Sequence, residues 1–546
     1  MFKRVSTLLI LLTGIAALFL GACSKQKSTA GKVVTFNLAA DAKTIDPQLG
    51  TTTSSARVLA MCKQGLTILG PKPGEVLPGG AESWDISKDG SVYIFHLRKN
   101  AKWSNGETVT AHDYLFGMKR ALEPSTAAQY AYMLYQVKNA EDYNQNKIKD
   151  FFKVGIKVID EFTLQITLNN QVPYFTQLLA NSVTFPLNEK FYNKVKKQYS
   201  LTADTLLYNG AYIIKNYVPN GKYIFTKNKY FWNKDSIKVE NMTFLMVNNY
   251  NTAANMFQTG SLDMTLIKAP QIPQFKNTKA LKSVPNGVVW YLQYNVDRHF
   301  FTNVNIRRAV ALAINREVMC KNILKNGSEP AYAFVPPGMF GGKVDGKLIT
   351  FRKRYGANLF DPNIEEAKRL YKMGLKDLGY DVSKEGKAKV TLLCESDPST
   401  LRTAQFIQQQ LFKNLGLNVI LQPNTFQARI SKMSQRNYDF VLAGWGPDYN
   451  YPTTFLNMWV TGGGNNDTNF SNTQYDKDVN IGQTSDNRDA RMTALNKAEV
   501  LLMKEMPIAP LYYGYGNWLV KPWLKGVVIR NSGTQISFQW AYVDKK

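Results

Sequence analysis

The chain has 546 residues, of which 44% are hydrophobic and 12% aromatic, and its formal net charge is +26. This composition is typical of a globular protein and excludes an intrinsically disordered chain. Because one core rarely grows beyond about 250–300 residues, the length predicts two or three subdomains. The basic residues are spread along the chain without a dense tract. We therefore expect a surface that faces anionic lipid or wall polymers, and no nucleic-acid partner.

Residues 1–22 have the pattern of a signal peptide. Two basic residues precede an apolar run at 8–20 that is too short to span a membrane. Small residues then lead to Cys23, a pattern that resembles the lipobox of bacterial lipoproteins. The resemblance implies a lipid on Cys23 and a place on the outer face of the cell membrane, and we expect a Gram-positive bacterium. An ordinary signal peptide with a chance cysteine is the alternative. Residues 23–31 are polar and small and predict a tether.

The first part of the folded body alternates between strand and helix signals. Residues 32–39 alternate as in a strand, and residues 54–63 predict a helix. Residues 83–97 predict a β-hairpin, because an Asp-Gly turn separates two alternating runs. Thr110 and Asp113 have the spacing of a capping box, which predicts that a helix follows at 114–122.

The C-terminal part has the pattern of parallel sheet. Residues 306–324 predict one long helix that ends before an Asn-Gly pair. A strand at 390–394, a helix at 398–415 and a strand at 418–422 then form a βαβ unit. Such a unit places its two strands parallel in one sheet.

Catalytic and metal-binding patterns are missing from the sequence. Besides Cys23 there are three cysteines, Cys62, Cys320 and Cys394, whose number leaves at least one unpaired and whose spacing suits no zinc site. We expect all three to be buried free thiols. There are only three histidines and no nucleophile elbow or phosphate loop. We therefore expect no enzyme, no metal and no cofactor.

A series of short motifs runs through the body in a recognisable order. It includes AESWDISKDG at 81–90, KWSNG at 102–106, NGAY at 209–212, AINR at 313–316 and WGPDY at 445–449. This series resembles the extracytoplasmic peptide-binding proteins of ABC importers (extracellular solute-binding protein family 5), and most of all the oligopeptide-binding proteins. The resemblance covers essentially the whole chain after the signal.

The resemblance implies an α/β fold with two lobes, of the periplasmic-binding-protein type with class II topology, and a ligand cleft between the lobes. Lobe I would comprise residues 32–68, 188–286 and 514–546, and lobe II residues 287–513. An extra small α/β subdomain of lobe I would comprise residues 69–187. The lobes would be joined by crossing segments near 287 and 513.

The resemblance also implies a peptide site around residue 448. The aspartate that matches Asp448 holds the peptide's α-ammonium group, which must be paired with a carboxylate when it is desolvated. Gly444, Trp445 and Gly446 match the strand that hydrogen-bonds the peptide main chain, which is a form of strand addition. The alternative is that Asp448 begins a turn and the glycines only bend a strand.

Further residues near the ligand are implied by the same resemblance, although each fits a core position equally well. They are Tyr130, Thr51, Thr52, Thr53, Trp290 and Tyr291.

The sequence departs from the family pattern in two places. Some relatives carry a disulfide at the positions of Gly446 and Gly287, so that bridge should be absent here. Some relatives have two asparagines where this chain has Leu266 and Ile267 after Asp-Met-Thr. We expect that part of the ligand pocket to be more apolar.

Together these features predict a monomeric, lipid-anchored receptor that captures oligopeptides by hinge closure. It would deliver them to the permease subunits of an ABC transporter that has separate ATPase subunits. The alternatives are the same fold with another solute (a dipeptide, a signalling peptide, a metal complex or a sugar), a surface hydrolase, and an adhesin or sensor.

Overall fold

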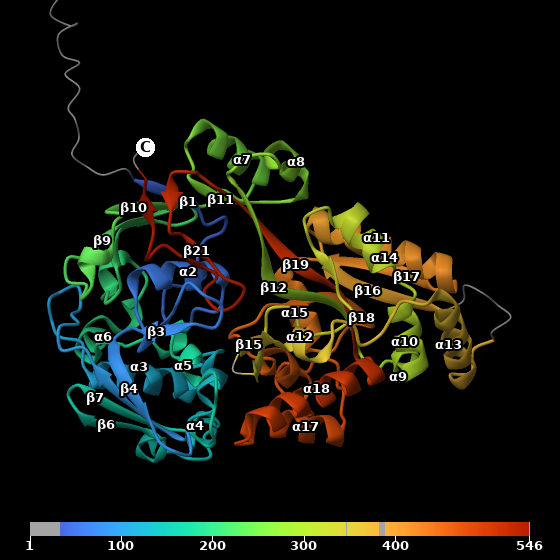
Figure 1. The fold of residues 1–546 in the computed structure, drawn as a ribbon, viewed down its shortest axis with the longest axis horizontal. Coiled ribbons are helices and arrows are strands. Elements are labelled where there is room, and N and C mark those ends of the chain that lie inside the picture. The colour runs from blue at the N-terminus through green and yellow to red at the C-terminus, as the bar shows by residue number, and fades with distance from the viewer. Residues whose placement is uncertain (1–32, 346, 382–387, 545–546) are drawn as a thin grey trace, which may run out of the picture.

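The protein folds into two halves that share one β-sheet (Figure 1). The computed structural model describes residues 33–345, 347–381 and 388–544, so the predicted signal peptide and Cys23 lie outside the described residues. Two long strands, β12 (Leu281–Tyr294) and β19 (Ile508–Val520), run from one half into the other. Within the described part of the chain, no helix combines the length and apolar character needed to cross a membrane.

The shared sheet has the strand order β17-β16-β18-β12-β19-β11-β1-β10-β9-β8, and β13 pairs with β19. The strands at the lobe I end are β1 (Val34–Asn37), β8 (Tyr212–Val218), β9 (Lys222–Lys227), β10 (Asn241–Leu245) and β11 (Met264–Ile267). Those at the lobe II end are β13 (Glu329–Pro330), β16 (Lys389–Glu395), β17 (Asn418–Asn424) and β18 (Phe440–Trp445). The sheet has parallel pairs on both sides of its antiparallel centre, and its β8 end is antiparallel again.

Helices cover the sheet in both halves (Figure 1). The longer helices of the first half are α2 (Thr53–Cys62), α3 (Ala111–Leu122), α6 (Glu189–Val195) and α7 (Tyr250–Thr259), with a short α8 at Ile272–Phe275. Those of the second half are α10 (Val304–Leu312), α13 (Ile364–Asp377), α14 (Pro398–Leu415), α15 (Phe426–Ser434), α17 (Thr473–Thr484) and α18 (Arg488–Glu505).

The two crossing strands pair antiparallel from Leu281 opposite Leu519 to Gln293 opposite Ile508. The pairing is interrupted between Pro285 and Val289, close to the predicted crossing point. Gly287 lies in this interruption with a φ of +74°, and a Cβ there would come within 2.1 Å of the carbonyl oxygen of Asn531. Only glycine fits this backbone conformation and this close approach.

The predicted hairpin of the extra subdomain is confirmed. It forms β4 (Ala81–Ile86) and β5 (Val92–Leu97), which belong to a separate four-stranded sheet with β6 (Ile156–Asp160) and β7 (Thr163–Thr167). The capping box is also found, since the Asp113 carboxylate accepts the Thr110 backbone N–H at 2.8 Å where α3 begins.

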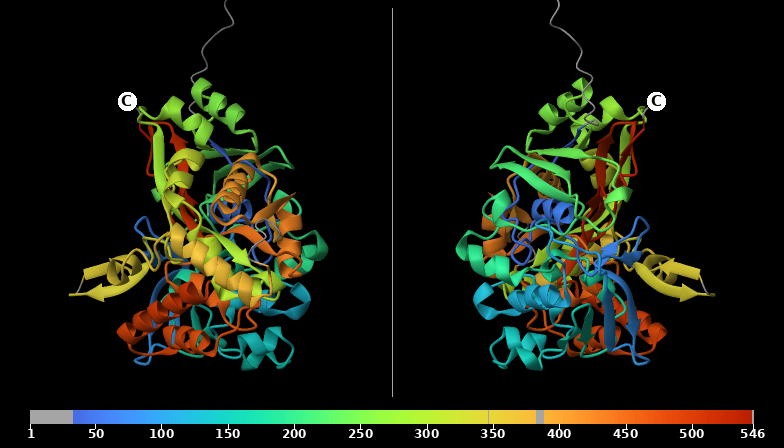
Figure 2. Two further views of the ribbon diagram at one scale, coloured as in Figure 1. Left: turned by 90° about the vertical axis from the view of Figure 1, so that its right-hand side faces the viewer. Right: turned by 90° about the vertical axis from the view of Figure 1, so that its left-hand side faces the viewer.

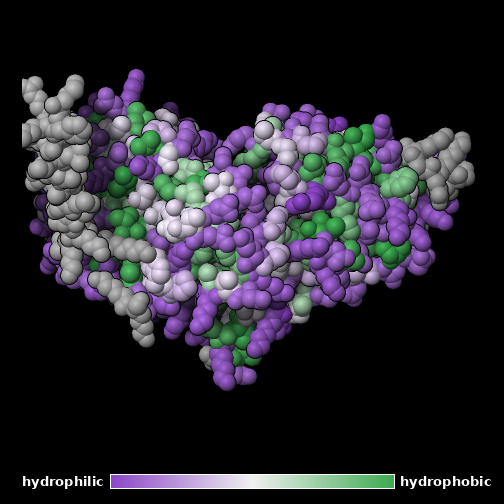
Figure 3. Space-filling model, turned by 90° about the horizontal axis from the view of Figure 1, so that it is seen from above, coloured by the Kyte–Doolittle hydropathy of each residue, from purple (hydrophilic) through white to green (hydrophobic). Residues whose placement is uncertain are grey.

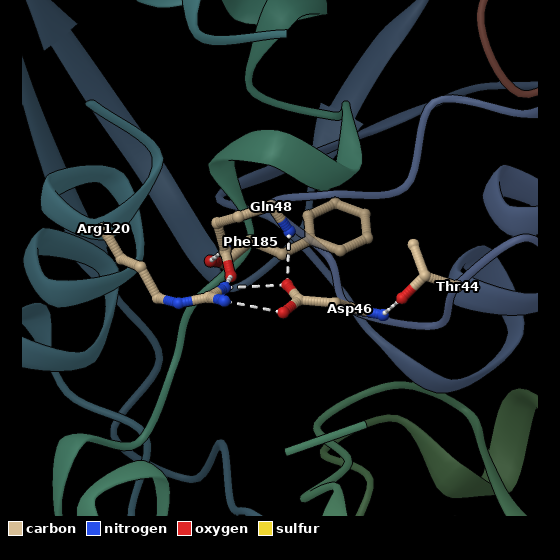
Figure 4. Close-up of polar contacts among 5 residues, drawn as sticks. All are labelled: Thr44, Asp46, Gln48, Arg120 and Phe185. Carbon is tan, nitrogen blue, oxygen red and sulfur yellow. Dashed lines mark hydrogen bonds and ion pairs between the residues drawn. The ribbon is translucent and has the colours of Figure 1, made fainter. Parts of the chain in front are cut away.

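A buried ion pair ties α3 to the loop before α2 (Figure 4). The two terminal guanidinium nitrogens of Arg120 each donate to one carboxylate oxygen of Asp46 at 2.7 Å. Gln48 completes the cluster, because its side-chain oxygen accepts from Arg120 and its backbone N–H donates to Asp46. The pair therefore fixes the extra subdomain against lobe I.

The predicted βαβ unit is confirmed in lobe II. Strands β16 and β17 are parallel and in register from Lys389 opposite Asn418, and α14 connects them. Asp397 caps the first turn of α14, and Gly416 ends the helix in the left-handed conformation that favours glycine.

The prediction of one helix over 306–324 is wrong. The segment divides into α10, a single turn α11 (Arg316–Val318) and a wide π-helical turn at Met319–Leu324. The buried Arg316 side chain causes the break, because it donates to the carbonyl oxygens of Ala311, Ile314 and, from β19, Pro510. These bonds satisfy carbonyls that a continuous helix would have used.

The three cysteines of the body, Cys62, Cys320 and Cys394, are free and buried, as predicted. Burial raises the pKa of each thiol, to about 12 for Cys62 and Cys320 and about 11 for Cys394. Their thiols are therefore protonated and unreactive near neutral pH.

The Asp46–Arg120 pair gives a stability prediction. Arg120→Met should lower the free energy of unfolding by about 3–5 kcal/mol, because it leaves a buried carboxylate unpaired. Urea denaturation measures the loss. The control Arg369→Met removes an exposed ion pair with Glu366 and should leave the stability nearly unchanged. Equal effects of the two substitutions would contradict this account.

Candidate functional site

Strand β18 offers part of one edge to a ligand. It pairs with β12 from Phe440 to Trp445, but on its other side β16 pairs only with Phe440 and Val441. No other strand of the described residues pairs with this second edge. The backbone from residue 442 onward, which includes the predicted Gly444 and Trp445, can therefore accept an added strand.

Gly444, Trp445 and Gly446, at and just after the end of β18, have different surroundings. A Cβ on Gly444 would lie 3.0 Å from the ring of Trp290, so a larger residue there would require the indole to shift. The Trp290 ring also stacks on Tyr512, with centroids 5.8 Å apart. Trp445 donates its indole N–H to the carbonyl oxygen of Thr454 at 2.9 Å, and Gly446 is exposed.

Asp448 follows the strand and lies at the boundary between lobe II and the extra subdomain. Its side chain accepts a hydrogen bond from the Tyr132 hydroxyl at 3.2 Å, and its backbone N–H donates to Thr454 at 3.1 Å. The rings of Tyr132 and Tyr130 are 5.8 Å apart, and the Tyr130 hydroxyl donates to the carbonyl oxygen of Thr51 at 3.3 Å. The structure thus brings Asp448, Tyr130 and Thr51 together.

Tyr132 is the member of this cluster that sequence reasoning missed. It lies two residues after Tyr130 in the segment Tyr-Ala-Tyr, and that spacing is the only signal that the sequence offered. Its importance depends on a contact with a residue more than 300 positions away.

The carboxylate of Asp448 lacks a cationic partner. No lysine or arginine of the described residues forms an ion pair with it. Burial raises its pKa to about 6, and the hydrogen bond from Tyr132 offsets only part of that effect. A partly buried carboxylate without a counterion is suited to pair with a cationic group of a ligand.

The other predicted residues have mixed surroundings. The Thr52 side chain caps α2 by accepting the Ser55 N–H at 3.1 Å, and Thr53 is the exposed first residue of that helix. Tyr291 is 2% exposed and packs edge-to-face on Phe334 and Trp459 in the core, on the other face of β12 from Trp290. We therefore leave Tyr291 out of the ligand-contacting set.

Two cavities lie along the boundary between the lobes, whose surface is hollowed between the two halves (Figure 3). The larger, of about 1030 Å3, lies between α8 and α14. The smaller, of about 130 Å3, lies against the crossing strands and is lined by Leu266 and Ile267 together with several polar residues, among them Asn286, Asn517 and Arg530.

Neither cavity is lined by Asp448, but the smaller one lies close to its loop. Arg530 and Gln535 line this cavity and belong to the same short hairpin as Gly533. The Gly533 backbone N–H donates to the carbonyl oxygen of Pro447, next to Asp448, at 3.1 Å.

Loop 447–451 of lobe II touches the extra subdomain directly. The rings of Tyr449 and Tyr174 stack with centroids 4.1 Å apart, and the Asn450 N–H donates to the Gln177 side chain at 2.8 Å. Together with the Tyr132–Asp448 bond, these contacts join lobe II to the extra subdomain.

This architecture, with two α/β halves, crossing strands and polar residues at their boundary, defines a two-lobed binding protein. The family model of bacterial extracellular solute-binding proteins, family 5, matches residues 75–467. The chain belongs to that family. It is a family of solute-binding receptors and not of enzymes.

Individual relatives match over nearly their whole length. The oligopeptide-binding protein OppA of Bacillus subtilis (strain 168) is 34% identical over 559 residues, covering 99% of this chain and 100% of the relative. The dipeptide-binding protein DppE of the same organism is 33% identical, and the match covers 95% of this chain and 94% of the relative. The structure of Listeria monocytogenes OppA bound to peptide is 33% identical, with a TM-score of 0.82 over 95% of this chain and 100% of that one. The predicted two-lobed fold is thereby confirmed.

Without ligand, the buried charge of Asp448 should cost stability. Its folded pKa of about 6 lies above the ordinary value of 3.8, so the cost develops as the pH rises from about 4 to about 6 and is complete above that range. At pH 7.5, Asp448→Asn should therefore raise the free energy of unfolding by at most about 3 kcal/mol, and the gain should vanish below about pH 4.

Denaturation curves at pH 4 and pH 7.5 measure this difference. The control Asp486→Asn removes an exposed carboxylate from the same lobe and should change little at either pH. A destabilised Asp448→Asn at pH 7.5 would show that the carboxylate is structural.

Proposed function

We propose that this protein is a lipid-anchored extracytoplasmic receptor that captures oligopeptides between its lobes and delivers them to an ABC importer. The importer would supply the permease and separate ATPase subunits, and the receptor would act as a monomer. Family membership and the peptide ligands named for the relatives above support the ligand class. The signal pattern and Cys23 support the location.

The observation that carries the proposal is the unpaired carboxylate of Asp448 beside an open strand edge. An α-ammonium group would supply the missing positive charge. Main-chain groups of Gly444, Trp445 and Gly446 would bind the peptide backbone, which is the same in every peptide. Affinity would therefore depend little on the peptide's side chains.

Hinge closure would bury the ligand. The crossing strands β12 and β19 join the halves, and the interrupted pairing at Gly287 is a natural point of bending. In the closed arrangement loop 447–451 meets Tyr174 and Gln177 of the extra subdomain. These contacts would close the site over a bound peptide and exclude water.

A dipeptide is the second candidate ligand, since a relative named for dipeptides is 33% identical. A dipeptide also carries a free amine, so the two candidates differ in length only. Binding of di-, tri-, tetra- and pentapeptides of alanine, compared by calorimetry, distinguishes the candidates.

The amine contact gives the main test. Free-amine peptides should bind, and N-acetylation or Asp448→Asn should each weaken binding by about 30-fold or more, because losing one partner of a buried charge pair costs about 2–5 kcal/mol. Isothermal titration with a mixed pool of short peptides measures this, with Asp486→Asn as the matched charge control. If acetylated peptides bind equally well, Asp448 is not the amine anchor.

Binding should also depend on pH. Below about pH 6 the carboxyl group of Asp448 is protonated in the free protein, so affinity for free-amine peptides should fall, by roughly tenfold per pH unit well below that value. Titrations from pH 4.5 to 7.5 measure the profile. Asp448→Asn should bind weakly and without this pH dependence, and a wild-type affinity that is flat over the range would argue against the contact.

A further inference from the structure

The smaller cavity at the boundary, of about 130 Å3, has a basic wall. Three cationic side chains line it, those of Arg57, Lys268 and Arg530, and no acidic side chain of the described residues does. The cavity lies against the paired strands β12 and β19, beneath α7 and α8, which form the top of the molecule in both side views (Figure 2). This imbalance of charge favours an anionic group of a ligand.

Arg57 of α2 has a free N–H group at this cavity. Its Nη2 group donates to the side-chain oxygen of Gln535 at 3.3 Å, and its guanidinium carbon lies 5.4 Å from the ring centre of Trp518. Its Nη1 group has no hydrogen-bond acceptor among the described residues and, unlike the buried Nε group, retains solvent-accessible surface. Arg57 therefore keeps a donor that a ligand can reach.

Neither Arg57 nor Lys268 is neutralised by a carboxylate. Among the described residues, no aspartate or glutamate forms an ion pair with either side chain. Burial lowers the pKa of Arg57 to about 10, and the nearby Tyr250 offsets part of that effect, so Arg57 stays charged at neutral pH. Lys268 is exposed, and its ammonium group lies 5.2 Å from the ring centre of Tyr250.

Arg530 adds charge to the wall but no free donor. All three of its guanidinium nitrogens donate to backbone carbonyl oxygens. Two carboxylates lie behind this part of the wall. Glu75 raises the pKa of Arg530 against the effect of burial, and Glu329 accepts a hydrogen bond from the Tyr515 hydroxyl at 2.6 Å. Neither carboxylate lines the cavity, so its inner surface remains basic.

Side-chain amides supply further donors to the same cavity. Asn286, Asn326 and Gln535 line it, and the amide oxygen of each accepts a hydrogen bond from a neighbouring residue. Their NH2 groups donate to no acceptor among the described residues, and each retains accessible surface. A wall of accessible N–H donors without a carboxylate matches an acceptor-only group, and an ionised carboxylate is such a group.

The cavity lies close to the proposed amine anchor. A Cβ on Gly533 would lie 3.6 Å from the carbonyl oxygen of Asp448. Gln535 is two residues further along the chain, so its Cα atom is at most about 7 Å from that of Gly533. An extended peptide advances about 3.3 Å per residue. The second to fourth residues of a peptide held at Asp448 would therefore reach the cavity.

We propose that this cavity binds the side-chain carboxylate of an aspartate or glutamate near the amino end of the peptide, so that the receptor prefers acidic peptides. The inference rests on the proposed function, because the amine must be held at Asp448 for the side chain to reach the cavity. The Nη1 group of Arg57 donates to the carboxylate, the amide groups donate beside it, and Lys268 adds charge. One side-chain preference is thereby added to a site that otherwise binds the peptide backbone.

Isothermal titration with hexapeptide amides of alanine tests the proposal. Each peptide carries one glutamate or one glutamine, placed in turn at every position from the second to the sixth. The amidated end removes the C-terminal carboxylate, which has the same chemistry. At one position between the second and the fourth, glutamate should bind about tenfold more tightly than glutamine, as expected for one charge-assisted hydrogen bond. At the sixth position the two should bind equally, which separates the contact from general attraction to a basic protein.

Variants of the cavity wall assign the preference to its residues. Arg57→Met should abolish the preference for glutamate over glutamine, and Lys268→Met should reduce it by about threefold, because Lys268 is exposed. Lys222→Met is the matched control. It removes the same charge from an exposed position on β9 that does not line the cavity, and it should keep the full preference.

The outcomes distinguish this inference from the proposed function. Peptides that bind without a preference for glutamate, or with a preference that neither Arg57→Met nor Lys268→Met changes, would overturn the inference and leave the peptide receptor intact. A preference for free acids over amides, with no effect of glutamate, would also overturn it. Failure of every peptide to bind would overturn both. Should Arg57→Met not fold, the exposed Lys268→Met decides the matter.

Discussion

The structure depends on the hydrogen-bonded ribbon formed by β12 and β19. These two strands place the lobe I and lobe II ends of the sheet in one continuous ladder, so every site at the boundary is positioned by them. At its lobe II end the ribbon supports β18, whose outer edge opens where β16 separates from it. At its centre the ladder is interrupted near Gly287, where a side chain would collide with the backbone of Asn531. The same two strands thus join the two halves and carry the interruption that lies between them.

Some buried charges within the halves have charged partners, whereas Asp448 and Arg491 at the boundary have none among the described residues. Inside lobe I and its subdomain, Asp46 is paired with Arg120, and inside lobe II, Glu499 is paired with Arg352 and also accepts two backbone N–H groups. At the boundary, Asp448 and Arg491 have neutral hydrogen-bond partners only. Buried Arg316 inside lobe II likewise has only carbonyl acceptors, so the lack of a counterion does not by itself mark a ligand site.

Much of the local structure followed from sequence because it depends on neighbouring residues. The hairpin of β4 and β5, the capping box at Thr110 and the boundaries of α14 all rest on signals within a few positions. The break before Arg316 could not be predicted, because one of its acceptors, Pro510, lies 194 residues away. The alternation of residues along β12 also does not predict whether Trp290 or Tyr291 faces the core. The cluster around Asp448 was reached only through family resemblance, and Tyr132 was missed because what marks it is a contact that exists only in three dimensions.

The unpaired charge of Asp448 has a consequence for the proposed closure. Its carboxylate would be desolvated when the halves meet, at a cost of several kcal/mol for a buried ion that has no counterion. In the open arrangement water would solvate the group, so its burial would oppose closure of the empty protein. A ligand that brings the opposite charge removes this cost in the closed form and not in the open one. A ligand can shift such an equilibrium only by its differential affinity for the two forms. The carboxylate of Asp448 is the place in the proposed peptide site where charge complementarity would supply that difference.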